Sequence, residues 1–167
     1  MKVIVMILLL VSVMGCTPRI LNIPLKSEGT MYASAGAFEY AVIRGKFEMQ
    51  DQTNAQVAVV GQSGLRIGTI ESVIAGRLLK DNISTVTRDE LAALTAEHRT
   101  RALVVEFGVS GRNPQGKKDA YSQEVIVLIK NFATGELVYK GVGEYMGSTE
   151  IDDVKGAILA ALENFGN

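Results

Sequence analysis

The chain has 167 residues, a formal net charge of -1, and a composition that is 47% hydrophobic and 21% charged. A chain of this length buries enough surface to fold as one ordinary domain without stabilising disulfide bonds or metal ions. Its 17 basic and 18 acidic residues make no broad positive field for nucleic acid. One Cys and one His supply neither an internal disulfide nor a structural zinc site, so we expect no metal and no cofactor.

The first sixteen residues have the form of an export signal. Lys2 precedes an apolar run over residues 3–14, which is shorter than the about 20 apolar residues of a membrane-spanning helix. Residues 13–16, Val-Met-Gly-Cys, resemble the bacterial lipobox, in which the cysteine is lipidated and becomes the new N-terminus. This resemblance implies lipidation of Cys16 and removal of residues 1–15 as a signal peptide. The alternative is an ordinary buried cysteine after a leader.

A lipidated Cys16 anchors a protein without any chain segment in the bilayer, because each buried CH2 of an acyl chain contributes about 0.8 kcal/mol. Thr17 follows the cysteine. In bacterial lipoproteins an Asp at that position usually signals retention at the inner membrane. By this resemblance we expect a lipid-anchored protein on the periplasmic face of the outer membrane.

Residues 16–36 are expected to be the lipidated N-terminus and a tether, and residues 37–167 the periplasmic domain. Four residues interrupt the short apolar pieces of the tether: Pro18, Pro24, Gly29 and Gly36. Its apolar side chains are Ile20, Leu21, Ile23 and Leu25. Their density leaves a second interpretation open, in which they pack on the domain or on a neighbouring molecule.

The first half of the domain predicts strands and helices in alternation. Residues 38–49 and 56–60 are rich in aromatic or β-branched residues and predict two strands. Residues 68–82 have helical periodicity, with Thr69 placed as the N-terminal cap. A brief strand is expected over residues 83–86.

Thr87 then begins a capping-box sequence that ends at Glu90 and predicts a second, short helix. Its inward-facing side chains are expected to be Leu91 and Leu94.

The second half predicts three consecutive antiparallel strands and a helix. Residues 103–109 alternate, residues 124–129 are apolar on both faces, and residues 136–145 return after a turn. Ser148 or Thr149 is expected to cap the last helix. Its apolar stripe consists of Ile151, Val154, Ile158, Leu162 and Phe165.

Together these elements predict an α+β fold of two layers, with a largely antiparallel sheet packed against two main helices. Residues 124–141, a strand, an Ala-Thr-Gly turn and a second strand, resemble small envelope lipoproteins of the DUF4136 kind. They are also similar to the N-terminal domains of TolB-like and curli-secretion-like lipoproteins. The resemblance implies a scaffold or accessory role and transfers no site residue.

Few residues in the chain suggest catalysis. His98 stands before a predicted strand without a nucleophile signature, and a solvated loop position is the favoured interpretation. Asp152 and Asp153 form an adjacent acidic pair. They fall in the first turn of the predicted last helix, where the helix dipole stabilises negative charge, so helix capping is favoured over catalysis. We therefore expect no enzymatic activity.

Two polar loops raise the question of anion binding. Residues 111–120 carry Arg112, Lys117 and Lys118, which suit lipid phosphate or an anionic wall polymer, although any long hairpin loop has this composition. Residues 61–68 join a strand to a helix as a phosphate-binding loop does. They lack the P-loop ending and the Gly-x-Gly-x-x-Gly spacing, so a plain connection is favoured.

A possible interaction surface is the glycine-rich strand. Gly141, Val142, Gly143 and Tyr145 form a strand with little bulk at its centre, which is unfavourable unless another chain or a ligand lies close. Core packing is the plainer alternative. With Leu21 and Ile23 of the tether, these residues are the predicted contact with a protein partner or an identical subunit.

The sequence thus predicts a non-enzymatic accessory or assembly subunit of an envelope or secretion complex, with a protein partner or homo-oligomer and no nucleic acid. The alternative is a periplasmic carrier or sensor of a small apolar or lipid ligand. An enclosed apolar cavity between sheet and helices would favour the carrier, and a core filled by side chains would favour the subunit.

Overall fold

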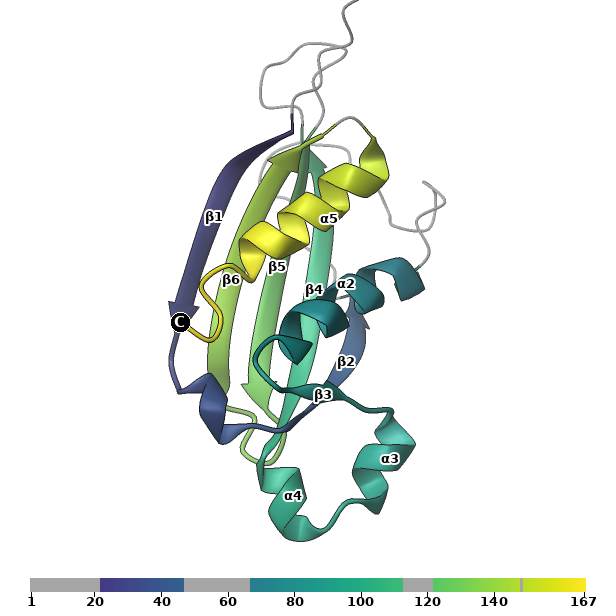
Figure 1. Cartoon of the computed structure of the whole chain (residues 1–167), viewed down its shortest axis with the longest axis vertical. Helices are drawn as coiled ribbons and strands as arrows, with labels where there is room; N and C mark the ends of the chain where they lie inside the picture. The colour runs from purple at the N-terminus through teal and green to yellow at the C-terminus, as the bar shows by residue number, and fades with distance from the viewer. Residues whose placement is uncertain (1–21, 47–66, 113–121, 148) are drawn as a thin grey trace, which may run out of the picture.

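The structure, a computed structural model, describes residues 22–46, 67–112, 122–147 and 149–167. Within them a six-stranded sheet carries two long and two short α-helices (Figure 1). The strands are β1 (Ile23–Met31), β2 (Tyr40–Lys46), β3 (Ser84–Thr85), β4 (Ala102–Arg112), β5 (Ser122–Asn131) and β6 (Leu137–Met146). The helices are α2 (Ile67–Leu79), α3 (Arg88–Ala93), α4 (Ala96–Thr100) and α5 (Glu150–Ala161), with a 3-10 turn at Ala35–Ala37. The predicted strand over residues 56–60 lies outside the described residues.

The strand order is β1-β6-β5-β4-β2-β3. Neighbours from β1 to β4 in that order are antiparallel, whereas β2 is parallel to β4 and β3 is parallel to β2. The predicted α+β fold, two layers with a largely antiparallel sheet and two main helices, is confirmed. The two parallel pairings were not expected. They arise because helices, and not hairpin turns, lie between β2, β3 and β4 along the chain.

Both long helices cover one face of the sheet (Figure 1). Alternate residues of β4 and β5 face them and are almost fully buried: Leu103, Val105, Phe107, Val125, Val127 and Ile129. The facing stripes are Ile70, Ile74 and Leu78 of α2, and Val154, Ile158 and Leu162 at α5. Complete burial of one such side chain contributes about 1.5–3 kcal/mol. This contact therefore holds the two layers together.

Thr149 caps α5, as the sequence predicts. Its hydroxyl accepts a hydrogen bond from the Asp152 N–H at 3.1 Å, and Asp153, almost fully buried, accepts one from the Gly147 N–H. The Asp153 carboxylate thus satisfies a backbone N–H ahead of α5, as a capping side chain does, and the Asp152 carboxylate accepts a hydrogen bond from the Thr149 hydroxyl at 2.7 Å. Ile151 does not belong to the buried stripe, since it is 47% exposed.

The short helix after Thr87 is also confirmed, with both bonds of the capping box between Thr87 and Glu90 present. Its hydrogen bonds to Thr87 lower the pKa of Glu90. By contrast, α2 begins two residues before Thr69, so Thr69 is not its cap. The helix α4 was missed because a five-residue helix is too short for a periodic pattern.

His98 therefore lies in α4 and not in a loop. Its Nδ1 is 3.0 Å from the hydroxyl of Thr95, the residue that caps α4, and its ring meets Tyr40 edge to face at 6.0 Å. The side chain is half-buried. These contacts attach α4 to the start of β2, which is a structural use of the histidine.

Residues 23–31, placed in the tether by their sequence, form β1, and the domain begins earlier than residue 37. Ser27, Gly29 and Met31 face α5 or the core, and the residues between them face away. The strand lacks an apolar alternation because two of its three helix-facing positions are small or polar: Gly29 lies against the Tyr139 hydroxyl, and Ser27 donates to the Ala160 carbonyl at 2.9 Å.

Candidate functional site

The glycine-rich strand β6 lies inside the sheet, between β1 and β5, and has no free edge. A Cβ at Gly141 or Gly143 would overlap a backbone carbonyl oxygen of α5. Tyr145 is half-buried, with its ring against a glycine of the same helix. The interpretation of Gly141, Val142, Gly143 and Tyr145 as an edge that binds a partner is therefore wrong. The glycines let α5 approach the sheet, and only Val142 faces the opposite side.

A groove beneath β6 is also absent among the described residues, because Tyr139 fills the space. Its hydroxyl donates to the Ala161 carbonyl at 2.6 Å, and its ring meets Phe165 edge to face at 5.3 Å. Burial raises the pKa of Tyr139 to about 12. The C-terminal end of α5 is thus fastened to the sheet by a buried, neutral phenol.

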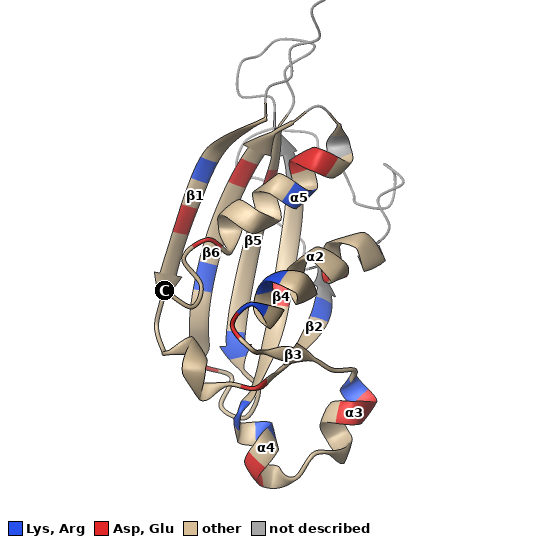
Figure 2. Ribbon diagram, in the orientation of Figure 1, with Lys and Arg blue, Asp and Glu red and all other residues tan. Residues whose placement is uncertain are grey.

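The face of the sheet away from α2 and α5 is more polar. Lys130 donates to Glu106 at 2.7 Å, and Ser122 donates to Glu144 at 2.6 Å. Glu144 lies opposite Glu124 in the register of β5 and β6, and both are buried. The lobe formed by α3 and α4 touches this face through a small apolar cluster of Val42, Leu91 and Ala102. Acidic and basic residues are interspersed over the described elements (Figure 2).

Several predicted site residues lie outside the described part of the chain: Cys16, Leu21, Lys117 and Lys118. Arg112 is the last residue of β4, where its backbone pairs with Ser122. Lipidation and anion binding stay predictions.

One edge of the described sheet is β1, and β6 is its only partner among the residues that the structure describes. Ile23 and Leu25, at its start, are each 44% exposed. Lys26 and Glu28 form an ion pair of 3.3 Å on the face away from the helices, and the Glu28 side chain is 67% exposed. Pro24 and a bulge interrupt the first part of the strand, so its second part offers the more regular edge.

The other edge is formed by β3 and β2 together. The short strand β3 pairs with Tyr40 and Ala41, and the last bond on this side runs from the Val86 N–H to the Ala41 carbonyl at 2.9 Å. From Ile43 onward, no described residue pairs with this side of β2. Among the described residues, the second half of β2 is therefore an open edge.

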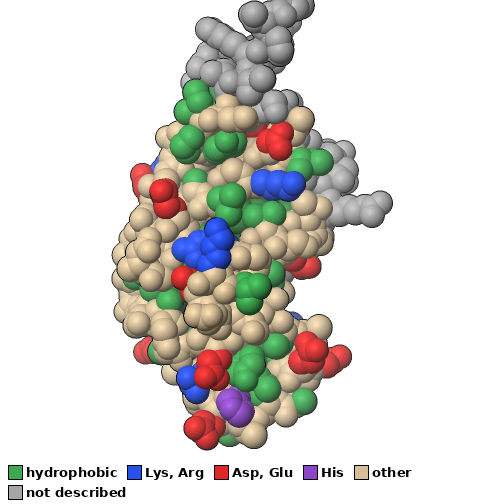
Figure 3. Space-filling model, viewed as in Figure 1, with side chains coloured by type: hydrophobic (Ala, Val, Ile, Leu, Met, Phe, Trp, Pro, Cys, Tyr) green, Lys and Arg blue, Asp and Glu red, His purple; other side chains and the backbone are tan. Residues whose placement is uncertain are grey.

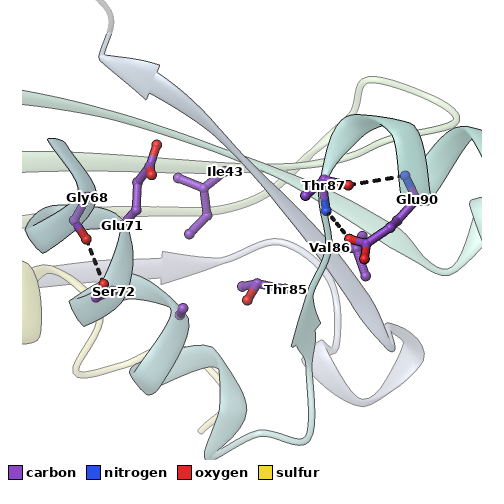
Figure 4. Close-up of a pocket in the computed structure, with 9 residues that line it drawn as sticks. Ile43, Gly68, Glu71, Ser72, Thr85, Val86, Thr87 and Glu90 are labelled. Atoms are coloured by element: carbon purple, nitrogen blue, oxygen red, sulfur yellow. Dashed lines mark hydrogen bonds between the residues drawn. The ribbon is translucent and has the colours of Figure 1, made fainter.

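A surface hollow of about 490 Å³ lies beside this open half of β2. Ile43 comes from β2, Ser72 and Ala75 come from α2, Thr85 ends β3, and Thr87 precedes α3 (Figure 4). Figure 3 shows the corresponding notch between the body of the molecule and the lobe of α3 and α4. The hollow is open to solvent and part polar, so it is not the enclosed apolar cavity that a lipid carrier needs.

Within the described ranges, no group of three or more His, Cys, Asp or Glu residues is placed to hold a metal ion. None of the helices in these ranges has the length and apolar character to cross a membrane.

The fold defines a two-layer α+β domain with a mixed six-stranded sheet. Similar solved structures are the PelC dodecamer from Paraburkholderia phytofirmans and a variant of it, at 16% identity and TM-scores of 0.54 and 0.53. They cover 84% and 82% of this chain, and 97% and 94% of their own. At this identity the similarity shows the fold alone. No family model matches the chain, and no curated protein matches its sequence.

Proposed function

We propose that this protein is a lipid-anchored lipoprotein of the outer membrane whose domain acts, without catalysis, as an accessory or assembly subunit of an envelope or secretion complex. We propose further that it works as a homo-oligomer. The observation that carries the proposal is that, within the described part of the chain, the sheet ends in an open edge on each side.

Open edges favour association because each presents unpaired N–H and C=O groups to another chain. The helix-covered face is filled: Phe107, Ile74 and Ile158 are at most 1% exposed. The domain is thus better suited to bind a second polypeptide at its edges than to enclose a small apolar ligand. The PelC structures of similar fold are dodecamers, which supports the oligomeric part of the proposal.

The non-enzymatic part is supported by the contacts of the candidate catalytic groups. His98 is engaged with the cap of its own helix, and Asp153 with the turn before α5. Such contacts leave these groups in structural positions, whereas a catalytic base is oriented toward a substrate site.

The oligomeric part is tested by measuring the mass of the full-length protein after mild detergent extraction of cell envelopes. We expect one species several times the mass of the monomer, and the same multiplicity after crosslinking of whole cells. A monomer in both measurements, at the cellular concentration, contradicts it.

The anchor is tested separately with radiolabelled palmitate. Label is expected in the wild type, whereas Cys16→Ala is expected to yield an unlabelled, unprocessed or soluble form. Label that persists in Cys16→Ala contradicts lipidation at this residue.

A further inference from the structure

We infer that the open half of β2 receives β1 of a second copy of this chain, so that the sheet continues from one copy into the next. This inference rests on the homo-oligomer proposed above and names its interface. Three properties of the two edges favour this contact: the direction of the strands, the outward-pointing backbone groups and the charges.

The strand directions fit such a contact. Three antiparallel pairings separate β1 from β4, and β2 runs parallel to β4, so β1 and β2 run in opposite directions. Copies related by rotation about an axis along the strands keep these directions. In such a ring β1 of one copy meets β2 of the next as an antiparallel neighbour. Two different surfaces in contact give a head-to-tail arrangement, which closes into a ring when the rotation from one copy to the next divides a full turn.

The unpaired backbone groups also correspond. On β2 the Ala41 carbonyl bonds outward to Val86, so by alternation the N–H and C=O of Ile43 point outward too, into the hollow. On β1 the Tyr32 N–H bonds to Val138 of β6. By the same alternation Gly29 directs its N–H and C=O away from β6, on the side where no described strand lies. Gly29 and Ile43 are therefore the positions that pair across the contact.

The charges at the two edges favour β1 of a second copy as the strand that pairs with β2. Setting Gly29 opposite Ile43 in an antiparallel register places Glu28 opposite Arg44. Both side chains are exposed and lie on the face away from the helices. Glu106, the neighbour of Arg44 on β4, is already paired with Lys130, and Arg44 has no ion pair among the described residues. The existing pair of Glu28 with Lys26 is exposed and therefore weak.

The contact is tested by disulfide formation in membranes that contain the full-length protein with Glu28→Cys and Arg44→Cys together. Directly opposed residues of a non-hydrogen-bonded antiparallel pair have Cα atoms about 4.5 Å apart, within the range of a disulfide. Because each copy carries both halves of the contact, mild oxidation is expected to give a ladder of dimers, trimers and larger covalent species. A mixture of the two single variants is expected to stop at dimers.

The matched control pairs Glu28→Cys with Thr134→Cys, an exposed residue of the turn between β5 and β6, and is expected to give no ladder. Charge reversal provides a second readout. Glu28→Arg or Arg44→Glu alone is expected to raise the concentration for half-assembly by about tenfold, and the two together to restore it.

The possible results distinguish a failure of the β1–β2 contact from a failure of the homo-oligomer proposed above. An oligomer of unchanged mass without a ladder, or covalent dimers from Glu28→Cys alone, overturns the β1–β2 contact and leaves the homo-oligomer standing. A monomer in the wild type overturns both.

Discussion

The two faces of the sheet differ in how their side chains are used. The helix-covered face holds nearly all of the fully buried large residues, and backbone of α5 comes into contact with glycines of β6. The opposite face carries the Lys130–Glu106 and Ser122–Glu144 contacts and half-buried residues such as Ile126. The comparison indicates that stability is concentrated on one face, and that the edges and the other face tolerate the changes that an interaction surface requires.

The strongest way to break the helix-covered face is to push α5 away from the sheet. Gly143→Val places a branched side chain where the Ala157 carbonyl lies, and is expected to cost about 5 kcal/mol or to prevent folding. Val142→Ala, the next residue on the opposite side, is expected to cost about 1 kcal/mol. Urea unfolding of the domain measures both, and similar losses at the two positions would refute the difference between the faces.

Truncation of one isoleucine on each face sharpens the comparison. Ile158 is fully buried on α5, so Ile158→Ala is expected to cost about 3 kcal/mol, within the 2–5 kcal/mol of such changes. Ile126→Ala, at a half-buried position on β5, is expected to cost about 1 kcal/mol, because part of the side chain is already in water. Thermal or urea unfolding decides, and an equal cost at both sites counts against the comparison.

Tyr139 provides a test by pH. Its pKa is raised from 10.0 to about 12 in the folded protein, so above pH 10 the unfolded chain loses the phenol proton while the folded chain keeps it. Stability is therefore expected to fall by roughly 2 kcal/mol between pH 10 and 12 through this group. Tyr139→Phe removes this part of the alkaline loss and is expected to cost about 1–2 kcal/mol at neutral pH, since the Ala161 carbonyl loses its donor. An unchanged alkaline slope in the variant would show that another group is responsible.

The smallest effect is expected for the Lys130–Glu106 ion pair, on the face of the sheet away from α2 and α5. Lys130 and Glu106 are both about one-third exposed, so a double-mutant cycle with Lys130→Ala and Glu106→Ala is expected to give a coupling below about 1 kcal/mol. The coupling is expected to shrink further in high salt. A coupling of several kcal/mol would mean that this face is far less solvated than its exposure indicates.

Features that depend on neighbouring residues could be predicted from the sequence. The caps at Thr87 and Thr149 and the β5–β6 hairpin each rest on a few adjacent residues, and all three are present. The pairing of β1 with β6 joins residues at opposite ends of the chain, and nothing in Lys26 or Glu28 indicates a strand. The two glycines of β6 correctly indicated a close approach. Their pattern did not reveal that the approaching chain is α5, since the spacing of glycines says nothing about which element lies above them.

The position of β1 at the start of the domain has a mechanical consequence. A pull on the chain at Ile23, directed along the strand, acts on the whole β1–β6 ladder at once, because its eight paired positions lie parallel to the force. Bonds loaded in shear share the load, whereas bonds opened one by one from an end do not. A sideways pull at the same residue would peel β1 from β6, starting at the Ile23–Met146 pair. The domain is therefore built to resist tension applied at the start of β1 in one direction and to yield in the other.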